Sequence, residues 1–442
     1  MASIVNDTDM LDESVLPFEL ELLTNSSKLA SKDSSPSLDS LSDANSQIER
    51  LSRGEGADSL DLLFSPLTGI LHDSGKLLFA NTDEKNQPEK NFFHKPCDSI
   101  FNIAVSVDCN ENQSWGYSVP LLYMTLRQRY PNANIIPLYH YFSPQYSRLT
   151  SLENHSRTSA FSVIAAAEEE KFDIESPGTE IEEPSKFAIK LLEQHDIDLL
   201  IIPGNEFDIS PKFYDEALEE KTLVNPRDQS RTKFEVALAH TAMFDLGIPT
   251  FGICGGLHVM AVASGAKLNQ HVDGHMAYGD DSVDFCTQTV RHTASASSSF
   301  AKALDELKRA ADEDKSNYSP ADVDILEMVQ DDLKLVELEG HSYFEFSVNC
   351  AHHQSVKRTE AFDQNFEVVA EHAEDNEIEV IESKRGCFSG GTQFHPEVAY
   401  ANNLLDGSAR SKTAILTSFF KPFEKAAIQH AEKRRVLSAI KS

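Results

Sequence analysis

The sequence predicts an α/β fold in which helices cover both faces of a mostly parallel sheet. Between residues 101 and 265, short apolar runs alternate with segments of helical spacing. The runs at 101–107, 197–202 and 248–253 are apolar almost throughout, as strands are when the sheet is covered on both faces. Alternation of such strands with helices is typical of a doubly wound domain.

Each expected element has its own local signal. β-branched and apolar runs predict strands, three- and four-residue apolar spacing predicts helices, and Gly265 closes the helix that precedes it. In chain order we expect strand 101–107, helix 118–130, strand 134–139, helix 187–195, strand 197–202, helix 231–246, strand 248–253 and helix 255–264. Beyond residue 280 we expect a helix at 301–312, a helical second half of 316–332, strands at 344–348, 366–370, 377–381 and 387–394, and a final helix at 415–435.

Charge and composition exclude several classes of partner. The 442 residues contain 39 Lys and Arg against 71 Asp and Glu, a formal net charge of −32. Such a surface repels phosphate backbones and anionic membranes, so we expect neither nucleic-acid nor membrane binding. The N-terminus lacks a basic start and a long apolar core, and the six cysteines are dispersed without a C-x-x-C pair. We therefore expect a reducing, cytoplasmic location.

The composition divides the chain into two parts. Residues 1–95 are acidic and rich in Ser, and we expect a partly disordered extension with short docking segments. Residues 96–442 form the α/β domain, which carries an insertion at about 295–340 and a C-terminal helix. The insertion is either a lid over the site or a surface for a protein partner, and the extension is a second candidate surface for a partner.

A first cluster of chemistry lies where strand 248–253 runs into the next helix. The segment Thr250-Phe-Gly252-Ile-Cys254-Gly-Gly256 contains G-x-C-x-G. Small residues beside Cys254 allow a tight turn that exposes the thiol at the top of the sheet, as in a nucleophile elbow. The positive end of the helix favours a thiolate there. A buried structural thiol is the alternative.

A second cluster ends the strand at 387–394. Gly391-Thr-Gln-Phe-His395-Pro-Glu397 places a histidine at the end of the strand, with a carboxylate two residues later. A nucleophile, a base and a carboxylate that orients the base are the parts of a catalytic triad. A core histidine with an incidental acid is the alternative. Together the two clusters favour Cys254, His395 and Glu397 as catalytic residues.

These residues resemble the class I glutamine amidotransferase-like hydrolases, closest to the gamma-glutamyl hydrolase and gamma-glutamyl-gamma-aminobutyrate hydrolase branch. The resemblance covers about residues 101–403 and rests on the order and spacing of five segments. They are the Cys254 elbow, His395-Pro396-Glu397, the loop 202–214, Arg231-Thr-Lys-Phe-Glu235, and Val348-Asn-Cys-Ala-His-His-Gln-Ser-Val356.

The resemblance implies a flavodoxin-like sheet, a Cys-His-Glu triad, and neither a metal nor another cofactor. It implies that Cys254 attacks a gamma-glutamyl amide or isopeptide bond, that an amine leaves, and that water hydrolyses the thioester to release glutamate. His395 would protonate the departing nitrogen. The oxyanion would be bound by the N–H of Gly255 and by the loop near Gly204 or Asn205.

Four positions depart from the pattern of the family. One is Cys350, which takes the place of Ser in the fifth segment and for which we expect a structural role. Asn205 stands where a second glycine is usual, and Gly255 where the hydrolase branch often has Arg. His258 stands where many amidotransferases hold the substrate with Gln, so free glutamine is in doubt as substrate; packing under the elbow is the alternative. With His258, we take His353, Gln354 and Asp208 as candidates for substrate binding.

Two further groups of residues can be explained either by a structural role or by a role in function. Arg231 and Glu235 lie one helical turn apart and form either an exposed pair or a substrate contact. His271, Asp273 and His275 form an H-x-D-x-H run that could hold a metal, although a polar loop is the commoner explanation.

Three functions remain open from the sequence. The first is the gamma-glutamyl hydrolase. The second is a glutaminase subunit of an amidotransferase, which would need a separate synthetase chain because no P-loop is present. The third is a degenerate binding or regulatory module on the same fold.

Overall fold

The computed structural model describes residues 99–107, 132–139, 182–205, 208–224, 226–275, 286–398 and 410–441, with five further positions between 122 and 130. The acidic extension expected at 1–95 lies outside these residues. Within the described part of the chain, no helix combines the length and apolar character that a membrane crossing requires.

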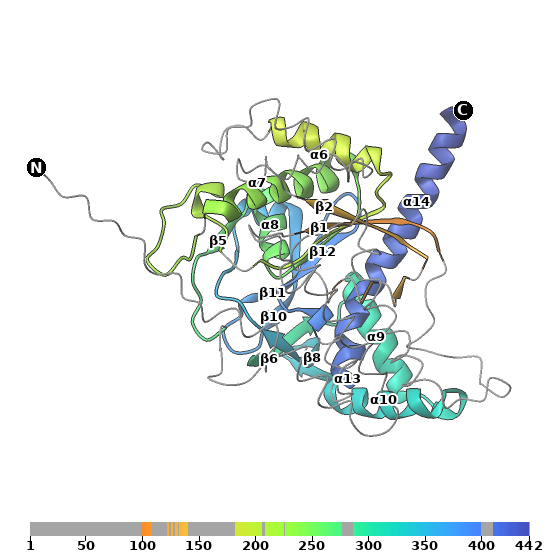
Figure 1. Ribbon diagram of the computed structural model, residues 1–442. Coiled ribbons are helices and arrows are strands. Elements are labelled where there is room, and N and C mark those ends of the chain that lie inside the picture. Colours follow the sequence, from red (N-terminus) through yellow and green to blue (C-terminus); the bar gives the residue numbers. More distant parts are fainter. Residues whose placement is uncertain are drawn as a thin grey trace, which may run out of the picture. The chain divides into compact units, whose positions relative to one another are not determined.

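Among the described residues, ten strands form one mixed sheet, whose parallel half carries the predicted elbow (Figure 1). In spatial order this half contains β2 (Asn134–Tyr139), β1 (Asn102–Val107), β3 (Leu199–Ile202), β4 (Thr250–Ile253) and β12 (Ser389–Thr392). Each pairs in parallel with its neighbour. The doubly wound, flavodoxin-like α/β class is therefore confirmed. Of the helix expected at 118–130, the described positions 122, 125, 126 and 129 are helical, and the helix expected at 187–195 falls within a longer one that ends at residue 194.

The other half of the sheet is antiparallel. It continues from β12 through β11 (Ile378–Ser383), β10 (Phe366–His372), β6 (Cys286–Thr293), β8 (His341–Cys350) and β7 (Lys334–Leu338). The strand β6 was not predicted, because the residues that it turns inward include Gln288 and His292 instead of an apolar series. A separate two-stranded ribbon joins β5 (Lys267–Asn269) to β9 (Ser355–Lys357).

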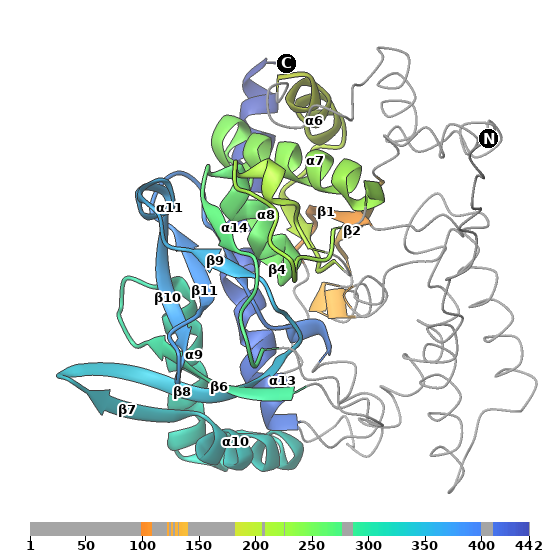
Figure 2. The same cartoon turned by 90° about the vertical axis from the view of Figure 1, so that its left-hand side faces the viewer.

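Helices cover both faces of the parallel strands, as Figure 2 shows for α7 and α8 on one side and α14 on the other. Leu200 and Ile202 of β3 pack with the first group of helices, and Leu199 and Ile201 with the second, because successive side chains of a strand point to opposite faces. The first group is α6 (Glu182–Gln194), α7 (Pro226–His240) and α8 (Gly255–Ala263). The second is α9 (Ser299–Asp312), α13 (Arg410–Thr417) and α14 (Lys421–Lys441).

Two helices differ from their predicted form. Residues 231–239 of α7 are buried all round, since α7 lies between α6 and α8, and a π-helical turn at Thr241–Leu246 follows it. The helix expected at 415–435 is divided into α13 and α14 by a 3₁₀ turn at Ser418–Phe420. The remaining helical elements are the 3₁₀ turns Pro211–Phe213 and Lys315–Asn317, α10 (Pro320–Asp332) and α11 (Glu360–Asn365).

The insertion at 295–340 contributes a layer of the core. It contains α9, α10 and β7, and α9 buries Phe300, Leu304 and Leu307. Glu382 of β11 accepts hydrogen bonds from the Ser298 hydroxyl and from the first amides of α9, which anchors the start of this helix to the sheet. The first half of the insertion therefore has a structural role.

Candidate active site

Cys254 occupies a sharp elbow between β4 and α8. Its φ of 51° and ψ of −108° are unusual for a residue with a side chain, and such strain concentrates at functional sites. The Cys254 N–H donates to the Thr392 carbonyl over 2.7 Å, which ties the elbow to β12. A Cβ on Gly256 would lie 1.9 Å from the Ile202 carbonyl oxygen, so only glycine permits this close turn.

His395 lies between Cys254 and a buried carboxylate. Its Nδ1–H donates to Glu397 Oε1 over 2.8 Å, and the Glu397 side chain is fully buried. Burial lowers the pKa of His395, but the negative charges of Glu397 and of a Cys254 thiolate outweigh it and raise that pKa well above 6.5. The arrangement therefore stabilises the imidazolium form of His395 beside the Cys254 sulfur.

The loop after β3 brings a third element to the same point. A Cβ placed on Gly204 would lie 2.9 Å from His395 Cε1 and 3.5 Å from the Cys254 Cβ. The carboxyl ends of β3, β4 and β12 thus converge, which is where ligands bind in open α/β sheets. The structure brings Cys254, His395, Glu397 and Gly204 together as the sequence placed them.

Arg231 is hydrogen-bonded to the loop that contains Gly204. Its Nη2 donates to the Gly204 carbonyl over 2.9 Å, and its Nε donates to Glu235 Oε1 over 3.0 Å. The Ser106 hydroxyl donates to the same Glu235 oxygen. Arg231 and Glu235 are both buried, so they do not form the exposed pair that was one of the alternatives. Because the peptide is trans, the Asn205 N–H points away from Arg231.

The two departures at residues 205 and 255 are one structural feature. A Cβ on Gly255 would lie 1.9 Å from Asn205 Oδ1 and 2.4 Å from its Cγ. The Asn205 side chain therefore fills the space that a side chain at 255 would need. Asn205 lies against the first residue of α8, whose first amides have no acceptor within the helix.

His258 is buried beneath the elbow. Its Nε2–H donates to Gln393 Oε1 over 2.8 Å, and burial lowers its pKa to about 3, so the ring is neutral. The amide of Gln393 in turn lies 3.7 Å from the Cys254 sulfur. Gln393 was not singled out from the sequence, although it lies within the run that led to His395.

The remaining substrate candidates meet at the loop after β3. His353 Nε2 donates to Asp208 Oδ1 over 2.7 Å, and the Leu223 N–H donates to Asp208 Oδ2. Gln354 accepts from the Ile209 N–H and donates to the Ile209 carbonyl, so both ends of its amide hold this loop. In this structure Asp208 is therefore paired with His353, and the Gln354 amide is hydrogen-bonded to the backbone of Ile209. The roles of these three residues in substrate binding stay predictions.

The H-x-D-x-H run is divided by the fold. His271 and Asp273 lie together at the surface, where His271 Nε2 is 2.8 Å from Asp273 Oδ1 and Lys221 contacts both. His275 is turned into the protein. The three residues therefore do not form one site.

Residues 181–397 match the family model described as Peptidase C26. This segment, slightly less than half of the 442 residues, is therefore similar to that family. The match spans the elbow, the loop after β3 and the His395–Glu397 pair, and it supports a function of the cysteine hydrolase or amidotransferase type.

One curated relative and two solved structures are similar to the chain. A Rickettsia prowazekii (strain Madrid E) protein, provisionally described as glutamine amidotransferase-like, is 25% identical over 213 residues, which are 47% of this chain and 73% of that protein. A Thermoplasma acidophilum protein, provisionally described as one component of a GMP synthase, has a TM-score of 0.36 at 13% identity and covers 78% of this chain and 100% of its own. A Thermotoga maritima glutamine amidotransferase has a TM-score of 0.32 at 13% identity, with 76% and 97% covered.

Proposed function

We propose that the protein is a cysteine-dependent hydrolase that cleaves a gamma-glutamyl amide or isopeptide bond. The observation that carries the proposal is the position of His395, hydrogen-bonded to buried Glu397 on one side and facing Cys254 on the other. This is the relative placement of nucleophile, base and orienting acid that acyl transfer needs.

In the first step, the Cys254 thiolate adds to the amide carbonyl and a tetrahedral oxyanion forms. We assign its stabilisation to the N–H groups of Gly255 and Asn205, with Gly204 letting the substrate approach closely. Arg231 supports this role, because its hydrogen bond to the Gly204 carbonyl fixes the peptide that carries the Asn205 N–H.

In the second step, the imidazolium of His395 gives its proton to the departing nitrogen, and the C–N bond breaks. The products are the free amine and a thioester on Cys254. A water molecule, deprotonated by the same ring, then attacks the thioester and releases glutamate. Glu397 keeps the Nδ1–H of His395 in place, so Nε2 is the nitrogen that exchanges the proton.

Asp208 and His353 are the proposed contacts to the charged end of the gamma-glutamyl group. A carboxylate suits the α-ammonium and an imidazole suits the α-carboxylate of such a substrate. The two side chains hold each other over 2.7 Å before substrate binds. His258 is proposed to act through Gln393 on the elbow, since it is buried and bonded to that amide.

The test measures glutamate released from glutamine and from a panel of gamma-glutamyl amides, without ATP or a partner protein. Wild type and Cys254→Ala are compared with Cys387→Ser, which removes a thiol outside the site. We expect release by wild type and Cys387→Ser but not by Cys254→Ala. Equal release by Cys254→Ala would refute the proposed nucleophile.

A glutaminase subunit of an amidotransferase is the second candidate, favoured by the description of the Rickettsia relative. It needs a separate synthetase chain, docked on the N-terminal extension or on the 295–340 insertion. Glutaminase activity that appears only on addition of such a chain would support it, and activity of the isolated protein on amides other than glutamine would exclude it.

A further inference from the structure

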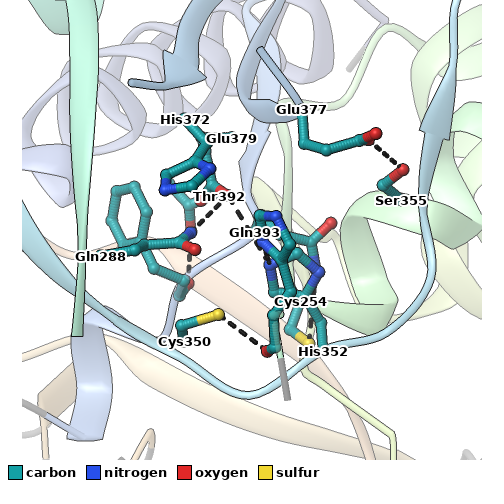
Figure 3. A network of polar contacts seen from close by, with 12 residues as sticks. Cys254, Gln288, Cys350, His352, Ser355, His372, Glu377, Glu379, Thr392 and Gln393 are labelled. Carbon is teal, nitrogen blue, oxygen red and sulfur yellow. Dashed lines mark hydrogen bonds and ion pairs between the residues drawn. The ribbon is translucent and has the colours of Figure 1, made fainter. Parts of the chain in front are cut away.

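A second cluster of reactive side chains lies among buried residues that the proposed mechanism does not use. His275 follows β5 in the chain, Cys350 ends β8, and His352 lies between β8 and β9. All three are buried, and one ligand atom of each lies within 4.8 Å of the other two. Figure 3 shows Cys350 and His352 with their polar neighbours, among them Gln288, His372 and Glu379.

The hydrogen bonds around the two rings determine where their protons lie. His275 Nε2 is 2.7 Å from Asp375 Oδ2, and a partly exposed carboxylate is ionised at neutral pH and only accepts. His352 Nδ1 is 3.0 Å from the Gln354 carbonyl oxygen, which also only accepts. In neutral rings, His275 Nδ1 and His352 Nε2 therefore carry lone pairs.

These two lone pairs face each other at 3.3 Å. Two acceptors at this separation repel unless a cation lies between them. Two nitrogens bound at about 2.0–2.1 Å to one tetrahedral zinc ion lie about 3.3 Å apart, which agrees with the observed separation.

A buried acid points to the same cation. Glu379 is completely buried, and its Oε1 lies 3.6 Å from His352 Nε2 while it accepts a hydrogen bond from Gln288. Its Oε2 has no hydrogen-bond partner among the described residues. An ion in this position would lie within reach of a buried carboxyl group, one oxygen of which has no hydrogen-bond partner among the described residues.

We propose that His275 Nδ1, Cys350 Sγ and His352 Nε2 bind a zinc ion, with the fourth position facing Glu379. Two nitrogens and a sulfur are the ligand types that zinc prefers. Asp375 and the Gln354 carbonyl are the outer acceptors that orient ligating histidines. The Cys350 thiol now lies 2.8 Å from the His275 carbonyl, and binding releases its proton to solvent as the thiolate turns to the ion. This site is separate from the surface pair His271 and Asp273, and no metal was expected from the sequence.

The ion would join two loops that border the candidate active site. The His352 N–H donates to the His275 carbonyl over 3.0 Å, and the Val272 N–H donates to the His353 carbonyl over 2.7 Å. Metal binding would fasten this contact and hold the start of the loop, where Asn349 contacts the backbone of His395. The proposed role is therefore structural, and it does not depend on the reaction proposed above.

The experiment titrates the full-length chain with Co²⁺ and Zn²⁺ after dialysis against a chelator. All samples carry Cys254→Ala, because the catalytic thiol and His395 could bind the same ions. We expect about one Zn²⁺ per chain by elemental analysis after gel filtration, and a thiolate-to-cobalt charge-transfer band with strong visible bands of four-coordinate Co²⁺.

Matched variants locate the ion. Cys350→Ser and His352→Gln should each lose the bound Zn²⁺, whereas Cys387→Ser and His271→Gln should keep it. Circular dichroism checks that each variant folds. Should Cys350→Ser not fold, protection of Cys350 from iodoacetamide by Zn²⁺, mapped by mass spectrometry in the Cys254→Ala chain, gives the same answer.

Three results would overturn the proposal. They are a folded Cys254→Ala chain that binds no Zn²⁺ at micromolar concentration, a cobalt spectrum without the thiolate band, and a band that survives Cys350→Ser. The first would assign a shared proton, and not a metal, to the space between His275 and His352.

Discussion

Asn349 holds the backbone of His395 at two points. Its Oδ1 accepts the His395 N–H and its Nδ2 donates to the His395 carbonyl, both over 2.7 Å. Asn349 is the penultimate residue of β8, in the antiparallel half of the sheet, while His395 follows the parallel strand β12. One side chain thus links the base of the candidate triad to the strands beside the proposed zinc cluster.

Loss of this contact should slow the reaction more than it weakens substrate binding. We expect Asn349→Ala to lower kcat by roughly 10- to 100-fold, because small displacements of a catalytic group have effects of that size. The free energy of unfolding should fall by about 1–3 kcal/mol. Asn349→Asp keeps the acceptor for the His395 N–H, so its kcat and its free energy of unfolding should lie between those of wild type and of Asn349→Ala. Steady-state glutamate release across pH measures both kcat and the titration of the base.

Asn365→Ala is a matched control, since Asn365 donates to backbone carbonyls far from His395 in the chain. It should leave kcat near that of wild type. An unchanged kcat and pH profile in Asn349→Ala would show that Asn349 does not position His395.

Gly255 and Asn205 should behave as a coupled pair. Gly255→Ala puts a Cβ 1.9 Å from Asn205 Oδ1, so we expect a loss of at least about tenfold in kcat/KM through displacement of the oxyanion loop. Asn205→Gly removes the obstacle, and the double variant should recover much of that loss. A double-mutant cycle on kcat/KM gives the coupling, expected at about 0.5–3 kcal/mol. If the effects of Gly255→Ala and Asn205→Gly on kcat/KM are additive, the two residues are not coupled through this contact.

Arg231 should be sensitive even to a conservative change. Arg231→Lys keeps the positive charge but cannot bond both Gly204 and Glu235 in the same fork geometry. We expect a lower kcat, by about tenfold or more, together with a loss of stability of about 1–3 kcal/mol because the site is buried. Kinetics and urea unfolding of the same sample separate the effect on kcat from the effect on stability. Ser106→Ala, which removes only the hydroxyl on Glu235, should have the smaller effect on kcat.

Asp198 should make stability depend on pH below about 4. Burial raises its pKa, but hydrogen bonds from His430, from Arg434 and from the Asn102 N–H outweigh it, so the pKa lies below 3.8. A depressed pKa gives stability that is present above the unfolded-state value and is lost as the pH falls through the folded-state value. We expect Asp198→Asn to lower the free energy of unfolding by about 1–3 kcal/mol at pH 7, and by progressively less as the pH falls.

The control for Asp198 is its neighbour Asp196. That residue is 62% exposed and contacts Arg434 at 3.4 Å, so Asp196→Asn should change stability by less than about 1 kcal/mol. Denaturant unfolding of both variants from pH 7 to pH 3 makes the comparison. If the stability lost in Asp198→Asn does not become smaller as the pH falls, the stabilisation does not come from the charge of Asp198.

The local sequence predicted the fold class and the elements of the site that depend on neighbours in the chain. Apolar runs mark β1, β3 and β4 because both faces of these strands are buried. The turn at Cys254 is encoded by its small neighbours, since only they allow the close approach to β3. The pairing of His395 with Glu397 is a two-residue relationship, and it too could be predicted from spacing.

The tertiary structure decided every relationship between distant segments. Strand β6 escaped prediction because its inward side chains are polar and are satisfied by partners from other strands, such as Glu379 for Gln288. The buried environment of His258 likewise follows from its contact with Gln393, 135 positions away.

The sequence by itself determined an α/β hydrolase-type domain with Cys254, His395 and Glu397 as its candidate triad. Only the tertiary structure joined Asn205 to Gly255, Asn349 to His395, and His275 to the Cys350–His352 segment. The physical reason is that periodicity and turn chemistry act over a few residues, whereas these contacts arise when strands and loops from distant parts of the chain pack together.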